Sequence, residues 1–200
     1  PPGTPPPNRG RRYPAEVLTA DEVRALLRAC STRSATGLRA RALIALLYRG
    51  GLRLSEALAL YPGDVDPGAG TVRVLRGKGG RARTVGLDPG AMALVERWAD
   101  QRRALGLTGR HPLLCTLAGG PLRDSYVRRL LPRLALRAGI ARRVHAHGLR
   151  YAHASELARE GLPVNLIQQQ LGHASLATTD RYLRHLAPVE VIRAVQARPW

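Results

Sequence analysis

Residues 147–182 of the chain read HGLRYAHASELAREGLPVNLIQQQLGHASLATTDRY. Apolar side chains recur in this stretch at helical spacing, and two glycines, Gly161 and Gly172, interrupt the pattern. We therefore predict helices over residues 147–160, 163–171 and 175–182. His147 and Arg150 are three residues apart, so a helix would place both side chains on one face.

The rest of the chain predicts a mainly α-helical domain that carries one small antiparallel β-hairpin. Thr19 and Glu22 have the spacing of a capping box ahead of an apolar run, which marks the start of a helix. The pair Gly50-Gly51 is a typical helix end. Further helices are expected over residues 39–49, 54–60, 89–104, 124–138 and 188–196, and strands over residues 71–75 and 81–87.

The first fourteen residues differ from the rest in composition. Residues 1–14 are rich in proline and arginine, which does not favour a packed element, and we expect a flexible basic linker. Residues 15–200 would then form one domain, since a chain of 200 residues suits a single hydrophobic core.

The charge balance favours nucleic acid as the partner. Lysine and arginine number 32 against 14 acidic residues, a formal net charge of +18, and such an excess attracts polyanions. A membrane-surface protein is the rival interpretation. However, no helix sets its charge against a bulky aromatic face, and the longest apolar run, Ala42 to Tyr48, is too short to cross a bilayer. With no secretory signal visible, we expect a cytoplasmic, DNA-associated protein, with Cys30 and Cys115 as reduced, buried thiols.

Lys78 is the only lysine in a chain that otherwise uses arginine for positive charge. Arginine does not give up its proton in a protein, whereas lysine can be tuned to do so. We therefore predict that Lys78, on a glycine-flanked turn, transfers a proton.

Two arginines have contexts that suit a phosphate. Arg53 lies at the start of a short helix, where unpaired backbone N–H groups also favour an anion. A guanidinium group matches two phosphate oxygens, so Arg53 and Arg150 could clamp one phosphodiester in place of a metal ion. Glu56 could orient a guanidinium or a histidine, or only pair with Arg53 or Arg49 along the helix.

Tyr182 is the candidate nucleophile. A tyrosine hydroxyl has a pKa of about 10 and needs help to lose its proton, which His147 or the arginines could supply. His173 would hydrogen-bond a phosphate oxygen, and Lys78 would protonate the leaving oxygen.

The motifs Gly-Leu-Arg-Leu-Ser-Glu-Ala-Leu, Gly-Lys-Gly-Gly, His-Gly-Leu-Arg, Leu-Gly-His-Ala-Ser and Thr-Thr-Asp-Arg-Tyr occur in this order. From about Thr19 to Val195 the chain resembles the catalytic domain of the tyrosine recombinases, or phage-type integrases. The resemblance implies site-specific breaking and rejoining of duplex DNA through a 3′-phosphotyrosyl bond, without a metal or other cofactor. It implies the catalytic residues Arg53, Lys78, His147, Arg150, His173 and Tyr182, with Glu56 as an accessory acid.

The resemblance also implies self-association into a tetramer on DNA, and it leaves a monomer open for the free protein. Members of the family usually carry an upstream helical DNA-binding domain, which we expect to be absent here. The segment at residues 1–14 resembles the linker that would follow it.

Other interpretations remain open at this point. A type IB topoisomerase would share the chemistry but reseal the same strand, and a non-catalytic module would use the basic surface for binding alone. An RNA-binding protein is disfavoured because aromatic residues make up only 4% of the chain. The histidines at 145, 147 and 153 lack a nearby cysteine, so we do not expect a zinc site. We expect general DNA-backbone contacts from Arg76, Arg81, Arg83, Arg142 and Arg143, and also from Arg49.

Overall fold

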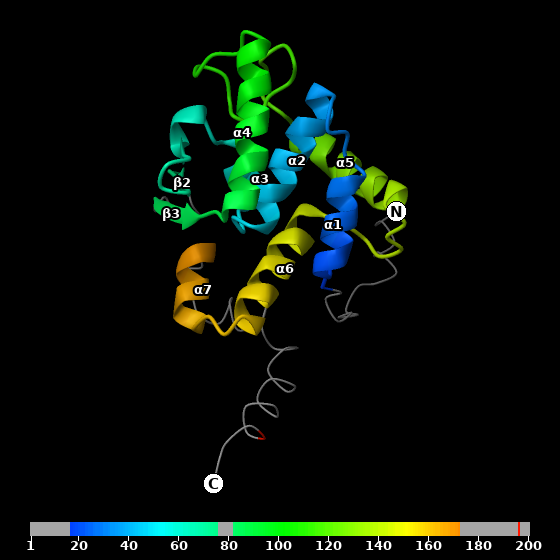
Figure 1. Ribbon diagram of the computed structural model, residues 1–200, viewed down its shortest axis with the longest axis vertical. Coiled ribbons are helices and arrows are strands. Elements are labelled where there is room, and N and C mark those ends of the chain that lie inside the picture. Colours follow the sequence, from blue (N-terminus) through cyan, green and yellow to red (C-terminus); the bar gives the residue numbers. More distant parts are fainter. Residues whose placement is uncertain (1–16, 76–81, 173–195, 197–200) are drawn as a thin grey trace, which may run out of the picture.

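A computed structural model describes residues 17–75, 82–172 and 196, and within them the protein is mainly helical (Figure 1). The α-helices are α1 (Ala20–Arg28), α2 (Ala35–Tyr48), α3 (Leu54–Leu58), α4 (Pro89–Ala104), α5 (Asp124–Arg137), α6 (Ala146–Arg159) and α7 (Val164–Leu171). One 3₁₀ helix, η1 (Pro62–Asp64), precedes the strands β1 (Val65–Asp66), β2 (Thr71–Val74) and β3 (Arg83–Gly86). The predicted fold class, mainly α with a small antiparallel sheet, is confirmed.

Helix starts follow from local capping. The capping box before α1 is confirmed: the Thr19 hydroxyl accepts from the backbone N–H of Glu22 at 3.2 Å, and the Glu22 carboxylate accepts from the backbone N–H of Thr19 at 2.8 Å. The second helix begins at Ala35, four residues before the predicted start. Ser34 caps it by accepting a hydrogen bond from the backbone N–H of Gly37 at 3.2 Å.

The sheet contains one strand more than the predicted hairpin. Strand β2 pairs antiparallel with β3, with Val72 opposite Val85, and β1 adds to the other edge of β2. Val72, Val74 and Val85 are buried, so the hairpin turns one face to the core. The short strand β1 lies in the stretch between the predicted helix at residues 54–60 and the predicted strand at residues 71–75.

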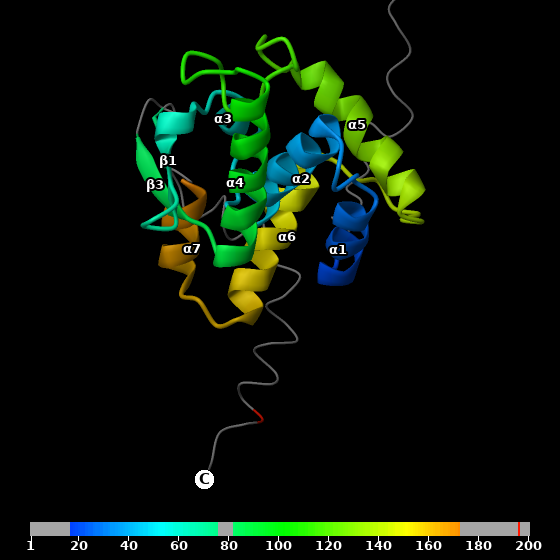
Figure 2. The same cartoon turned by 45° about the horizontal axis from the view of Figure 1, so that its top comes forward.

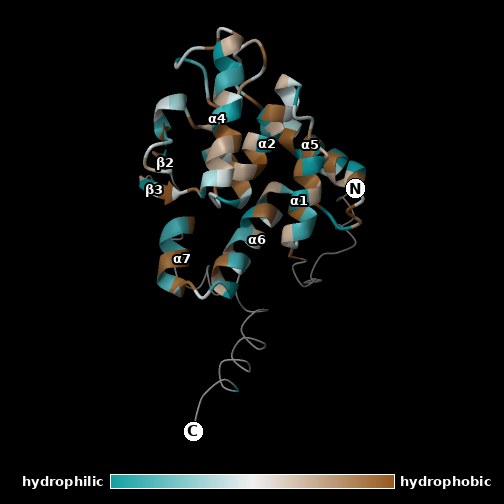
Figure 3. Ribbon diagram, viewed as in Figure 1, coloured by the Kyte–Doolittle hydropathy of each residue, from teal (hydrophilic) through white to brown (hydrophobic). Residues whose placement is uncertain are grey.

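Helix α2 forms the centre of the domain. Almost all of its residues are buried, and it packs against α4 and α6 (Figures 1 and 2). The apolar faces of α2, α4 and α5 turn towards the interior (Figure 3). Trp98 on α4 is fully buried, and its indole N–H donates to the carbonyl of Leu113 at 2.7 Å. Cys30 and Cys115 are buried free thiols, as expected.

Helices α6 and α7 form a smaller apolar cluster of their own beside the main core. It consists of Tyr151, Ala154, Ile167 and Leu171. Helix α7 also contacts β3, and it ends at Gly172, whose φ of +64° lies in the left-handed region. Helix α7 therefore packs against both α6 and the sheet. In the described ranges, no helix has the length and apolar character needed to cross a membrane.

Candidate active site

An open cleft of about 460 Å³ lies where α3, α5 and α6 approach each other. Its lining brings together the three described residues that the sequence proposed for catalysis, Arg53, His147 and Arg150, and adds Arg143 and His145. Arg53 is the residue before α3, and His147 and Arg150 lie on the first two turns of α6. Two helix starts therefore place cationic side chains at one cleft.

Arg150 ties three distant segments together. Its side chain is 1% exposed, and its Nη1 donates to the carbonyl oxygen of Gly51. Its Nη2 donates to the carbonyl of Leu171 at 2.6 Å. Arg53 reaches the same helix end, because its Nη2 donates to the carbonyl of Gly172 at 3.1 Å. The two predicted phosphate-binding arginines thus converge on the C-terminal end of α7.

Glu56 is a buried carboxylate surrounded by arginines. Its side chain is 2% exposed and accepts from the backbone N–H of Arg53 at 2.8 Å and from Arg53 Nη1 at 2.6 Å. It also accepts two bonds from Arg83, at 3.0 and 2.8 Å, while Arg150 Nη1 lies 3.9 Å away. Burial alone would raise the pKa of Glu56, but hydrogen bonds from Arg83 and Arg53 outweigh it and hold the pKa at about 2. The carboxylate therefore stays ionised and orients Arg53.

His147 is suited to accept a proton. Its ring is exposed at the cleft, yet desolvation and then the positive charges of Arg150, His145 and Arg53 lower its pKa below the usual value. The neutral form therefore dominates at neutral pH. The ring centroid of His145, the residue before α6, lies 6.4 Å from that of His147.

The arginines expected on the DNA backbone occupy different environments. Arg143 is exposed and lines the cleft. Arg142 donates to the carbonyl of Val17 at 2.9 Å and pairs with Glu22, which anchors the start of the described chain. The guanidinium of Arg83 is directed into the molecule towards Glu56. The remaining predicted site residues lie outside the described ranges: Arg76, Lys78, Arg81, His173 and Tyr182.

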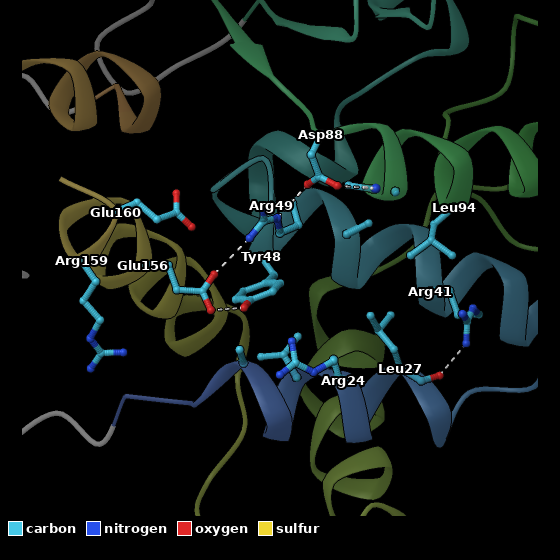
Figure 4. A pocket seen from close by; sticks show the side chains of 15 residues that line it. Arg24, Leu27, Arg41, Tyr48, Arg49, Asp88, Leu94, Glu156, Arg159 and Glu160 are labelled. Atoms are coloured by element: carbon cyan, nitrogen blue, oxygen red, sulfur yellow. Dashed lines mark hydrogen bonds and ion pairs between the residues drawn. The ribbon is translucent and has the colours of Figure 1, made fainter. Parts of the chain in front are cut away.

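Arg49 belongs to a separate pocket of about 800 Å³ between α1, α2, α4 and α6 (Figure 4). Its guanidinium joins Asp88 at 2.7 Å to Glu156 at 3.2 Å, and Glu156 also accepts from the hydroxyl of Tyr48. This arginine therefore links α2 to α4 and α6 and takes no part in the candidate cleft.

Sequence reasoning missed the inward position of Arg83 and the role of Gln170. The Gln170 side chain bridges β3 and the turn after α2: its Nε2 donates to the carbonyl of Gly86 at 3.1 Å and to that of Gly50 at 3.5 Å. Alternation along β3 was the available signal for Arg83, because it is two residues from the buried Val85 and so shares its face. No comparable sequence signal identifies Gln170.

Gly172 is a position beside Arg83 where a methyl group is poorly tolerated. A Cβ there would lie 2.7 Å from Nε of Arg83, and the left-handed φ adds a conformational cost of about 1–2 kcal/mol. We expect Gly172→Ala to lower the free energy of unfolding by about 1–3 kcal/mol more than Gly139→Ala, because forced overpacking adds to the same backbone cost. Gly139 has a φ of +68° with open space around it, so it is a matched control in urea unfolding. Equal losses in the two variants would show that Arg83 moves aside freely.

The buried side chain of His153 should make the folded protein less stable in acid. It is 4% exposed, and within the described structure neither ring nitrogen has a hydrogen-bond partner. Burial first, and then the charges of Arg49 and Arg150, lower its pKa to about 3 despite the nearby carboxylate of Asp88. Below pH 6.5 the unfolded chain therefore binds a proton that the folded chain does not. The free energy of unfolding consequently decreases as the pH is lowered.

We expect this histidine to cost about 2 kcal/mol of unfolding free energy between pH 6.5 and pH 5, at about 1.4 kcal/mol per pH unit. Urea unfolding at several pH values measures it, and His153→Leu should flatten the dependence by that amount. An unchanged pH dependence in the variant would contradict the assignment.

The described elements adopt the fold of the tyrosine recombinase catalytic domains. The crystal structure of XerA recombinase superposes with a TM-score of 0.82 at 29% identity, covering 98% of this chain and 69% of that one. The XerH site-specific recombinase bound to its palindromic difH substrate gives a TM-score of 0.75 at 27% identity, over 92% of this chain and 53% of that one. The chain belongs to the phage integrase family, whose pattern matches residues 16–188.

Two sequence relatives of the chain are Xer-type tyrosine recombinases. The tyrosine recombinase XerD of Mycobacterium leprae is 38% identical over 96% of this chain and 63% of its own length. The tyrosine recombinase XerC of Xanthomonas campestris is also 38% identical, over 92% of this chain and 56% of its own length. The chain thus spans about three fifths of the length of these curated relatives.

Proposed function

We propose that this chain is the catalytic domain of a site-specific DNA recombinase that breaks and rejoins duplex DNA through a 3′-phosphotyrosyl intermediate. The observation that carries the proposal is the convergence of Arg53, His147 and Arg150 at one open cleft, beside a carboxylate that orients Arg53. In this proposal residues 15–200 form the catalytic domain and residues 1–14 a basic linker.

The arginines supply the electrostatic part of the reaction. In the displacement, negative charge grows on the non-bridging oxygens of the phosphate, and preorganised guanidinium groups stabilise it without solvent reorganisation. Arg150 is held by two backbone carbonyls and Arg53 by Glu56, so both groups are oriented before the substrate arrives. His173 adds a hydrogen bond to a phosphate oxygen.

Residues of this chain can supply the nucleophile and every proton transfer of the covalent step. The Tyr182 oxygen forms a bond to phosphorus, and its proton passes to His147, whose lowered pKa favours the neutral, accepting form. The bond from phosphorus to the 5′ oxygen breaks, and Lys78 donates a proton to that oxygen. A 5′-hydroxyl from a partner strand then reverses these steps and restores the phosphodiester.

Duplex DNA is the proposed substrate. The formal net charge of +18 favours a polyanion, and the XerH relative was solved on its difH DNA substrate. We propose that the protein associates with DNA in the cell and assembles on it as a tetramer, the arrangement that exchange between two duplexes needs. Arg76, Arg81 and Arg143 would contact the DNA backbone.

A nicked suicide substrate tests the proposal. Cleavage next to a nick releases a short strand, so the adduct cannot be resealed and accumulates. We expect a detergent-stable protein–DNA band in which the protein is joined to the 3′ side of the break, as shown by labelling each strand end. Binding without an adduct would favour the non-catalytic module, and relaxation of supercoiled plasmid without joined products would favour the type IB topoisomerase.

A further inference from the structure

We propose that Arg83 is a positioning residue that neutralises Glu56 and thereby sets Arg53 for the phosphate, rather than a contact to the DNA backbone. This inference rests on the proposed function, because it assigns Arg83 a part in that same cleft. It replaces the surface role that we expected from the sequence with an internal one.

The geometry of Arg83 leaves little of it for DNA. Its side chain is 13% exposed, and both terminal nitrogens donate to Glu56 in a two-point contact at 3.0 and 2.8 Å. Its third nitrogen, Nε, donates to the carbonyl of Gln170 at 3.3 Å. The side of the guanidinium that a phosphate would use is therefore occupied by the carboxylate.

The contacts of Arg83 join three separate elements behind Arg53, a residue of the cleft lining. Arg83 begins β3, Glu56 lies on α3, and Gln170 lies in the last turn of α7. Glu56 in turn holds both the backbone and the guanidinium of Arg53. Movement of Arg83 would thus release the carboxylate that orients Arg53. Lys78 lies five residues before Arg83 in the sequence, so the same contacts anchor the strand that follows this lysine.

The balance of charges around Glu56 is a second reason to assign Arg83 a positioning role. Three guanidinium groups, from Arg53, Arg83 and Arg150, surround one carboxylate within 3.9 Å. The site therefore keeps a surplus of two positive charges when Arg83 is present. Without Arg83, Glu56 would be neutralised by Arg53 and Arg150, because a buried carboxylate requires a close counter-charge. Arg83 leaves the charges of Arg53 and Arg150 available to the phosphate.

The test separates cleavage from binding with Arg83→Gln and a matched control, Arg73→Gln. Arg73 lies on the neighbouring strand β2 and is 59% exposed. We expect Arg83→Gln to slow single-turnover cleavage of the suicide substrate about 100-fold, as a misplaced active-site group does. Its DNA affinity and the slope of log affinity against log salt should match the parent. Arg73→Gln should cleave at the parent rate.

A double variant tests the path through Glu56. If Arg83 acts by neutralising Glu56, then Arg83→Gln combined with Glu56→Gln should lose no more activity than Arg83→Gln alone. Arg83→Lys keeps the charge but not the two-point contact, and we expect an intermediate cleavage rate with the parent salt slope.

Three results would overturn the proposal. A salt slope reduced by about one, with affinity lost in proportion, would make Arg83 a phosphate contact. If the fold-losses in cleavage rate of Arg83→Gln and Glu56→Gln multiplied in the double variant, Arg83 and Glu56 would act independently. If neither Arg83→Lys nor the double variant unfolded cooperatively, the role of Arg83 would be to stabilise the fold and not to position Arg53.

An NMR titration tests the role of Arg83 without requiring DNA cleavage. If the parent protein formed no adduct, that result would count against the proposed function only. The carboxyl signal of Glu56 can be followed by NMR as pH falls. In Arg83→Gln the pKa of Glu56 should rise from about 2 towards the ordinary value of a glutamate. An unchanged titration would show that Arg83 does not neutralise this carboxylate.

Discussion

Replacing Tyr182 with phenylalanine should abolish the covalent protein–DNA adduct and leave DNA affinity within a few-fold of the parent value. Phenylalanine has no oxygen to attack phosphorus, so no other change in the cleft can restore the step. Phenylalanine keeps the aromatic ring, and one lost hydrogen bond changes binding by only about 1 kcal/mol. Adduct formation on a nicked substrate and affinity on an intact duplex measure the two effects separately.

Tyr61→Phe provides the control for this substitution. Tyr61 is 46% exposed, follows α3 and lies outside the residues that line the cleft. Its phenylalanine variant should form the adduct at the parent level. An adduct that persists in Tyr182→Phe, or one that disappears in Tyr61→Phe, would remove Tyr182 from the proposed role.

Replacing Lys78 with arginine should slow cleavage by about 10² to 10⁴-fold, the range that a lost general acid produces. Arginine keeps the positive charge, so DNA affinity and its salt dependence should stay close to the parent values. It cannot release its proton, however, and the 5′ oxygen would leave unprotonated. Single-turnover cleavage of the suicide substrate at saturating protein measures the loss.

A substrate with sulfur in place of the 5′ bridging oxygen isolates the proton transfer. A thiol has a pKa of about 8.5, so its anion leaves without protonation. Most of the rate lost in Lys78→Arg should return on this substrate. Arg53→Gln should gain no such rescue, because it loses stabilisation of the phosphate rather than a proton. Equal rates for parent and Lys78→Arg on the ordinary substrate would exclude Lys78 from catalysis.

The elements that the sequence predicted best are those with signals inside a few residues. The capping box at Thr19, the glycine pair after α2 and the alternation of β2 each report their own local geometry. The start of α2 was placed too late because its cap lacks half of that signal: Ser34 is present, but the third helical position is Gly37 rather than an acid. Strand β1 has two residues and depends on its neighbour for pairing.

The residues of the candidate site also differ in how far their positions can be predicted from nearby sequence. Arg53, His147 and Arg150 stand in motifs whose order the family resemblance recognises, and they do line one cleft. The burial of Arg83 depends on a partner 27 residues away. In a chain this rich in arginine, residue type alone does not distinguish a guanidinium that meets a carboxylate inside the protein from one that faces DNA.

The backbone carbonyls that hold Arg53 and Arg150 also bear on how the protein folds during its synthesis. Arg150 is bound to a carbonyl 99 residues before it, and Arg53 to one 119 residues after it. Contacts of such long sequence separation form late in folding, because the intervening chain must first close. A chain still being synthesised on the ribosome lacks the acceptors at Leu171 and Gly172 until the domain is nearly complete. If the proposed function holds, partly made protein would therefore lack the capacity to break DNA.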